Sequence, residues 1–224
     1  MIRKLSKIDW RYALGEVFLI FLGINLALWF NNLNENRKTR SQEIETLKEI
    51  KLGLQADLID IVTNIEGFEN RTKSYDLLIK YLINKKPMDD SLRMYLPFLS
   101  GSTMFVTNRT PYETLKSHGF WLISNDSLRA AIMKYYDVSQ DWMLINEDGY
   151  LQHYTMNIKP ILVKHFEFRK GLLPFDFDAL CQDREVLQNL LWANSLNYLQ
   201  LNLYKDIRTE ANTLIQKIDK ELAR

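Results

Sequence analysis

Three histidines and one cysteine are the side chains of this chain that most often serve catalysis or metal binding. His118, His153 and His165 lie far apart and form no HExxH motif, and Cys181 has no second cysteine for a CxxC pair or an internal disulfide. The sequence also lacks a glycine-rich phosphate loop and a GxSxG elbow. We therefore predict no enzymatic activity, no metal and no cofactor. An enzyme would need a site assembled from the central loop.

Two of these reactive side chains have a structural explanation. His118 precedes Gly119 at the expected end of a short helix, where a cation is favoured by the helix dipole. Cys181 follows Leu180 and is typical of a small core residue rather than a reactive thiol.

Glu147, Asp148 and His153 form a loose polar group near Gly149 that could hold a cation. Three loosely spaced polar residues in a solvated turn are more often plain surface. We predict exposed surface here.

An acidic residue, Glu16, interrupts the most apolar part of the chain. Residues 13–30 are apolar except for Glu16 and Asn25. Eighteen helical residues at 1.5 Å each cover about 27 Å, close to a hydrocarbon core of about 30 Å. The run leads into WFNNLNENRK instead of a small-residue cleavage site. The sequence therefore predicts an uncleaved transmembrane helix over 13–30, with a central helix of a soluble core as the alternative.

Glu16 allows two interpretations. Its carboxylate lies about one turn inside the run, where it can reach the interface beside Arg11 or take up a proton. The functional alternative is a protonatable carboxylate that works against a second membrane protein in an ion-driven complex. Asn25 lies about 180° round the helix from Glu16, so we expect the two to make separate contacts across a helix oligomer, where Gly23 favours close approach.

Charges and aromatic rings beside the run predict the topology. Lysine and arginine are in slight excess on its N-terminal side, and aromatic rings that favour the headgroup zone flank both ends. The cations of segment 1–12 are Arg3, Lys4, Lys7 and Arg11, and the flanking rings are Trp10, Tyr12 and Trp29. We predict a single-pass protein of a bacterial inner membrane, with a cytoplasmic N-terminus and a periplasmic C-terminal domain.

A strict 3,4 spacing of mostly apolar residues runs from Ile44 to Leu82, and the same register extends back through the span to Glu16. It predicts a stalk helix over 31–84 that continues the span and stops before Pro87. We expect packing and oligomer contacts along this stripe. Its members include Leu19, Gly23, Leu26, Leu47, Leu54, Leu58 and Ile61. The oligomer order is open, with a homotrimer or homodimer favoured.

The C-terminal residues 183–224 read as one long helix that Asp183 caps. This helix and the stalk have similar lengths and can pack antiparallel. Residues 85–182 between them read as a loop, a short helix and a central long helix. The predicted fold class is all-α: a transmembrane helix continuing into the stalk and packed with two further long helices as an elongated up-down bundle.

The central region contains a readable helix-loop-helix pattern. Thr110 is expected to cap a short helix begun by Pro111, with Glu113 completing a capping box and Gly119 ending the helix. Ser124 or Asn125 is expected to cap the longer helix that follows. Its apolar face comprises Leu128, Ala131, Ile132, Tyr135 and Tyr136, is expected to continue through Trp142 and Ile145, and should bend at Gly149 or Pro160.

Two segments, GEVFLIFLGINLALWFNNLNENRK at 15–38 and YETLKSHGFWLISNDSLRAAIMKYYD at 112–137, resemble a family of bacterial single-span membrane proteins known only as a domain of unknown function. The motif positions are Tyr112, Leu115, Gly119, Asn125, Leu128, Arg129, Tyr135 and Tyr136. The resemblance implies an inner-membrane anchor and a helical domain. It implies no activity and no catalytic residue.

The net charge of +1 and the even spread of cations among acids give no reason to expect a nucleic-acid partner. The expected partners are the lipid bilayer and further copies of the chain, with a second membrane protein as an additional candidate. Two functions remain open: a membrane-anchored helical scaffold that self-associates through span and stalk, and an accessory subunit of a transport or ion-driven complex that uses Glu16.

Overall fold

The computed structural model describes the chain over residues 10–169 and 171–224, with side chains described from Leu14 onward. Residues 1–9 of the basic N-terminal segment therefore lie outside the described part. The protein is 84% helical with almost no strand, so the predicted helical class is confirmed. Two-residue strands, β1 (Phe166–Glu167) and β2 (Leu173–Pro174), pair antiparallel.

The first helix, α1 (Trp10–Asn84), contributes to two compact units of the chain, residues 1–46 and 47–224. Within 1–46, α1 contains a window of mean hydropathy 1.7, long enough to cross a membrane, and none of that window is buried. The helix ends at Asn84 as predicted, because Lys85 adopts a left-handed φ of 48° and Pro87 follows.

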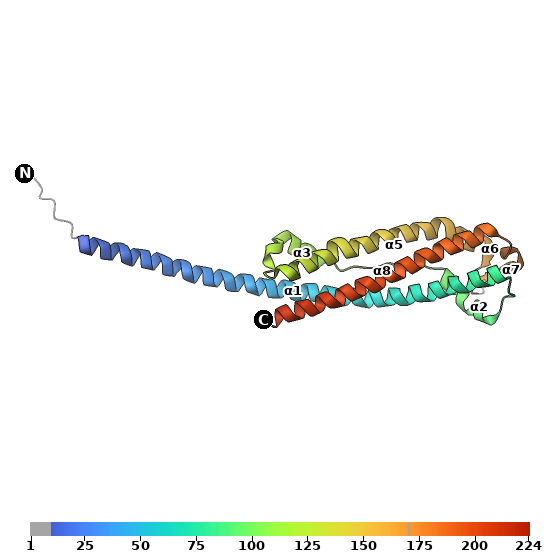
Figure 1. Cartoon of the computed structure of the whole chain (residues 1–224), viewed down its shortest axis with the longest axis horizontal. Coiled ribbons are helices and arrows are strands. Elements are labelled where there is room, and N and C mark those ends of the chain that lie inside the picture. The colour runs from blue at the N-terminus through green and yellow to red at the C-terminus, as the bar shows by residue number, and fades with distance from the viewer. Residues whose placement is uncertain (1–9, 170) are drawn as a thin grey trace, which may run out of the picture. The chain divides into compact units, whose positions relative to one another are not determined.

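The 47–224 unit continues through short elements to a second very long helix (Figure 1). The helices after α1 are α2 (Asp90–Tyr95), η1 (Leu96–Leu99), α3 (Thr110–His118), η2 (Phe120–Leu122), α4 (Asp126–Lys134), η3 (Tyr135–Gln140), α5 (Asp141–His153), η4 (Tyr154–Ile158), α6 (Lys159–His165), α7 (Phe177–Leu180) and α8 (Arg184–Leu222). The Asp183 carboxylate caps α8 by accepting from the backbone N–H groups of Glu185 and Val186.

Polar contacts along the unit fix the direction of α8 relative to α1. The Lys51 ammonium lies 2.6 Å from the Asp219 carboxylate, and the Lys205 ammonium lies 2.8 Å from Glu69. Further along, the Asn194 amide donates to Asp76 over 2.7 Å. Residue numbers rise on α1 as they fall on α8, so the two helices run antiparallel, and α5 lies beside α8 (Figure 1).

The elements α4, η3, α5, η4 and α6 follow one another without a break over residues 126–165, and we call them the central helix. It contains two π-helical segments, η3 and η4, and its buried face shifts at η3. Through η3 the buried positions step by four residues, from Leu128 to Ile132, Tyr136 and Gln140. A π turn is wider than an α turn, so it carries the helix face past the 3.6-residue period. The expectation that Trp142 and Ile145 continue the buried face is therefore wrong: they are 57% and 65% exposed.

The helix is not interrupted at Gly149, the first of the two positions where a bend is expected, because Gly149 lies inside α5. Pro160, the second position, lies two residues after the end of the π segment η4. Proline has no N–H to donate and crowds the preceding turn, and a π turn is one way to relieve that crowding.

The buried stripe of α1 also differs from the predicted seam. Leu47, Leu54 and Ile61 are fully buried and Leu58 packs partly against the same core, but they face α8 and the central helix of their own chain. Phe68, Tyr75 and Leu82 are also buried at predicted positions, and the helix additionally buries Asp57, Asn64 and Arg71, each one residue before a predicted position. A side chain fully covered within its own chain has no surface left for an oligomer contact, so the stalk seam is intramolecular.

Candidate functional site: a strap and a polar clasp on the helical bundle

Residues 100–109 form an irregular segment between η1 and α3, which we call the strap. An irregular backbone cannot satisfy its own N–H groups, so they need other acceptors. Asp57 accepts from the N–H of Asn108 over 2.7 Å, and Asp60 accepts from Val106 over 3.0 Å. Carboxylates on α1 therefore hold the strap by its main chain.

The central helix adds a third carboxylate to this set. The N–H of Phe105 donates to both oxygens of Glu147, over 3.1 Å and 3.3 Å. The Tyr204 hydroxyl of α8 donates to the same carboxylate. Glu147 thus ties the strap, α5 and α8 together inside the core.

Two glycines of α1 let the strap lie close to the helix. A Cβ on Gly53 would lie 3.3 Å from the carbonyl oxygen of Asn108, and one on Gly67 would lie 3.2 Å from the Thr103 methyl carbon. Both distances are shorter than ordinary van der Waals contact. The absence of a side chain at these positions is therefore a requirement of the close approach.

Burial dominates the electrostatics of the two innermost acids. It raises the pKa of Asp57 to about 6, against the opposing effects of the hydrogen bonds from Asn108 and Gln140. It also raises the pKa of Glu147, although the Tyr204 and Phe105 bonds favour the charged form. Both carboxyls therefore bind protons more tightly in the folded chain than in water.

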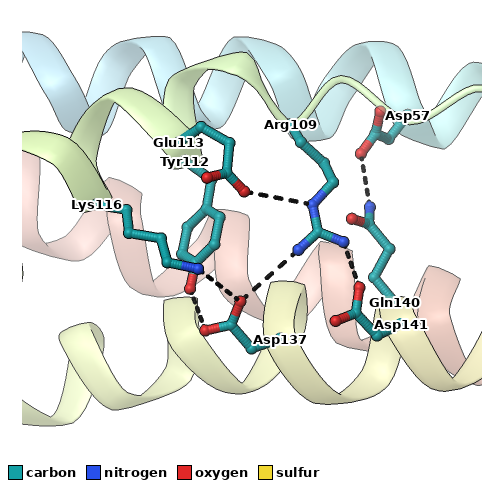
Figure 2. Close-up of polar contacts among 8 residues, drawn as sticks. All are labelled: Asp57, Arg109, Tyr112, Glu113, Lys116, Asp137, Gln140 and Asp141. Carbon is teal, nitrogen blue, oxygen red and sulfur yellow. Dashed lines mark hydrogen bonds and ion pairs between the residues drawn. The ribbon is translucent and has the colours of Figure 1, made fainter.

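The last strap residue, Arg109, connects α3 to the central helix (Figure 2). We call the polar network of Arg109, Tyr112, Glu113, Asp137 and Asp141 the clasp. The Arg109 guanidinium pairs with Asp141 and lies 3.7 Å from Asp137 and 3.9 Å from Glu113. The Tyr112 hydroxyl donates to Asp137. Asp137 and Asp141 lie one turn apart and so present both carboxylates to the same arginine.

Tyrosines of the predicted motif pack beneath the clasp. The Tyr112 ring stacks on Tyr136 with centroids 4.4 Å apart and planes 14° apart, and Tyr135 meets Tyr136 edge-on at 4.9 Å. Leu115 and Leu128 are buried in the same core. These residues hold the helix-loop-helix segment on the bundle.

The polar motif residues shape the loop between α3 and α4. Gly119 ends α3 with a φ of 101°, which favours glycine, and Asn125 caps α4 by accepting from the N–H of Leu128. The Asn125 amide also donates to Glu221 near the end of α8 over 2.6 Å. Arg129 donates to the carbonyl oxygen of Ile123 over 3.0 Å.

The predicted capping of α3 is wrong. Thr110 is the first helical residue, Arg109 occupies the cap position, and no side chain caps this end. Pro111 is the second residue of the helix. Glu113 lies against the Arg109 guanidinium, so it contributes to the clasp instead of a capping box.

The histidines and the cysteine are dispersed over the bundle. The His118 ring bonds the Thr114 carbonyl oxygen over 2.9 Å at the end of α3, and His153 lies at the end of α5. Cys181 is half-buried and packs against the apolar cluster that includes Leu180 and Val186. Among the described residues no group of three or more metal-binding side chains comes together. The expectation of an exposed Glu147 is wrong, because this side chain is buried in the core, where it accepts from the N–H of Phe105.

Glu16 and Asn25, the polar residues of the apolar run, lie on the uncovered part of α1. Asn25 donates its amide to the Phe21 carbonyl oxygen one turn earlier, over 2.7 Å. Leu19 and Leu26 are exposed, and a Cβ on Gly23 would meet nothing within 4 Å. Glu16 is likewise exposed.

The carboxylates that hold the strap were not identified from the sequence. Asp57, Asn64 and Arg71 recur every seven residues inside the stripe of α1, and this spacing was the available signal. Polar residues repeated at one heptad position indicate an internal polar column. Gln140, which donates to Asp57, and Glu147, which accepts from the strap, are also seven residues apart on the central helix.

As a whole, the site is a set of carboxylates, each already occupied by N–H or O–H donors, without a nucleophile and base in contact. Such an arrangement is suited to holding segments together. Comparison with known proteins adds nothing to this picture, since no family model, no curated protein and no solved structure matches the chain.

Proposed function

We propose that this protein is a membrane-anchored helical scaffold. The carrying observation is the contrast along one helix: the apolar window of α1 near the N-terminus is entirely uncovered, whereas from Leu47 onward the stripe of the same helix is buried. A soluble protein rarely leaves so large an apolar surface in water. A lipid bilayer covers this surface without any further protein element.

The proposal extends to assembly. The stripe residues Leu47, Leu54 and Ile61 are used within the chain, so self-association is assigned to the span, where Leu19, Gly23 and Leu26 lie on one predicted register. Residues 47–224 then form an elongated up-down bundle, with the strap and clasp as its rigid core. The slight excess of cations before the span supports an N-terminus in the cytoplasm and a periplasmic bundle.

The test is native mass spectrometry of the full chain extracted with its lipids, for the wild type and for Glu16→Gln. The scaffold proposal predicts one homo-oligomer in both samples. The competing function is an accessory subunit of an ion-driven complex, and the placement of Glu16 on the uncovered part of α1 favours it. It predicts that an unrelated membrane subunit co-purifies with the wild type and that this association is weakened or lost in the variant. A monomer in both samples would refute self-association.

A further inference from the structure

The interior of the 47–224 unit holds buried polar side chains that the strap and the clasp do not use. Arg71 is 4% exposed, Gln200 is 1% exposed and Asn197 is fully buried. Two guanidinium nitrogens of Arg71 and both amide atoms of Asn197 and Gln200 have no hydrogen-bond partner among the described residues, and the Tyr150 hydroxyl faces Arg71 with no other partner there. Buried polar groups are nearly always satisfied, so these groups indicate a missing partner.

The helix directions place these groups near one another. The Phe68 ring of α1 lies 5.5 Å from the Tyr204 ring and 5.3 Å from the Tyr150 ring, so α1, α5 and α8 meet at this level. Arg71 lies one turn after Phe68, and Gln200 lies one turn before Tyr204. Because α8 runs antiparallel to α1, both steps lead in the same direction along the bundle. Arg71, Tyr150 and Gln200 therefore share one layer.

The next layer and the strap complete the surroundings. Asn197 lies one turn beyond Gln200 on the same buried face of α8. On the other side, the Thr103 hydroxyl of the strap is also buried without a partner, and its methyl carbon lies against Gly67, one turn before Arg71. The strap thus covers this part of the interior.

The charge of Arg71 lacks a counter-charge in direct contact. Its guanidinium carbon lies 4.7 Å from the Phe68 ring centroid and 5.6 Å from that of Tyr150. No carboxylate oxygen of the described residues lies within 4 Å of it, whereas Arg109 has three such acids around it. Glu147 already accepts from Tyr204 and Phe105. A buried arginine stays charged, so it requires an anionic or strongly polar partner.

We propose that Arg71, Tyr150, Gln200 and Asn197 bind a small inorganic anion of halide size inside the bundle. The guanidinium supplies charge and N–H donors, the two amides supply further N–H donors, and the tyrosine supplies an O–H donor. A single-atom anion suits a tightly packed interior better than an oxyanion. The inference concerns the bundle alone and is independent of membrane anchoring.

The experiment is thermal unfolding of the full chain in detergent, in sodium chloride or in sodium gluconate of equal ionic strength. Gluconate is too large for the interior, so it serves as the non-binding anion. Chloride at ten times its Kd should raise the unfolding midpoint by about 3 to 6 °C over gluconate. Arg71→Met, which keeps an apolar side chain on the two rings, should abolish the difference. Equal midpoints for the wild type in the two salts would overturn the proposal.

A matched control separates the site from general salt effects. Arg93→Met removes an exposed arginine of α2 that lies 3.8 Å from Asp90, and it should keep the full chloride effect. If Arg71→Met does not fold, crystals of the wild type grown in bromide provide the decision. An anomalous bromide peak beside Arg71 supports the site, and water alone at that position overturns it.

Discussion

At the scale of single residues, the most informative side chain is Asp57, which is buried and yet bound to the strap and to the central helix. Its partners are the N–H of Asn108 at 2.7 Å and the amide of Gln140 at 3.4 Å. The amide nitrogen of Gln140 makes this bond, and its oxygen, Oε1, has no partner among the described residues. A neutral group with one donor and one acceptor would fit this place better than a carboxylate.

The raised pKa of Asp57 has a defined consequence for stability. The folded chain holds this proton up to about pH 6, whereas an unfolded chain releases it near 3.8. The contribution of Asp57 is therefore largest below about pH 4, declines as the pH rises to about 6, and is constant above that. The total change is at most about 3 kcal/mol, since one pKa unit corresponds to about 1.4 kcal/mol.

We therefore expect Asp57→Asn to stabilise the folded chain at pH 7 by about 1 to 3 kcal/mol and to reduce the loss of stability between pH 4 and pH 6.5. The asparagine carbonyl can accept from Asn108, and its amide can donate to a flipped Gln140. Thermal unfolding of the full chain across this pH range measures both effects. Asp148→Asn, an exposed change on α5, should preserve the wild-type slope. A destabilised Asp57→Asn with an unchanged slope would contradict this expectation.

At the scale of elements, the sequence predicted the helices and their ends where one local signal decides the outcome. Pro87 ends α1, Asp183 begins α8, Gly119 ends α3 and Asn125 begins α4. Each of these signals depends on one residue and its immediate neighbours, so it can be recognised in the sequence without knowledge of tertiary contacts.

The strap and the π segments were not predictable in the same way. The strap is placed by carboxylates far away in the sequence, such as Asp57 and Glu147, and nothing within residues 100–109 identifies those acceptors. The π turn of η3 contains no proline or glycine that would mark it in the sequence. It moved Trp142 from the expected core face to the surface, since a 3.6-residue period contains no information about an inserted residue.

Two helical glycines provide a test of the close approach of the strap. Gly149 has open space around its Cβ position, so Gly149→Ala should stabilise α5 by about 0.5 to 1 kcal/mol through helix propensity. Gly53→Ala gains the same propensity but places a methyl group 3.3 Å from the Asn108 carbonyl oxygen. We expect Gly53→Ala to be less stable than Gly149→Ala by about 1 kcal/mol or more. Thermal unfolding of the two variants in parallel measures the difference.

Hydrogen exchange shows where the Gly53→Ala change acts. The amide of Asn108 should exchange faster in Gly53→Ala than in Gly149→Ala, because the added methyl displaces the backbone that Asp57 holds. Equal stability and equal exchange in the two variants would mean that the strap does not need the glycine.

At the scale of the whole molecule, the apolar residues of α1 divide between two environments. Leu54 is fully buried within its own chain, whereas Gly23 lies uncovered in the proposed span. Both residues lie on one predicted register, but substitutions at the two positions should affect different properties. A change at Leu54 should lower the stability of the bundle, and a change at Gly23 should lower the oligomer population.

We expect Leu54→Asn to destabilise the bundle by about 3 to 5 kcal/mol, because it removes buried apolar volume and buries an amide. Gly23→Ile should leave thermal unfolding of the bundle unchanged but lower the oligomer population, because the larger side chain prevents close helix approach. Circular dichroism and native mass spectrometry of both variants separate the two outcomes. Dissociation of a still folded Leu54→Asn chain would instead assign the stalk stripe to the oligomer.

The proposed crossing of a membrane by α1 near its N-terminus can be measured through the accessibility of cysteines on its two sides. In a Cys181→Ser background, Ser6→Cys precedes the apolar run and Ser41→Cys follows it. With a membrane-impermeant maleimide on bacterial cells whose outer membrane is permeabilised, we expect Ser41→Cys to be labelled and Ser6→Cys to be labelled only after the inner membrane is lysed. Labelling of both positions before lysis, or of neither, would contradict a span with the bundle outside.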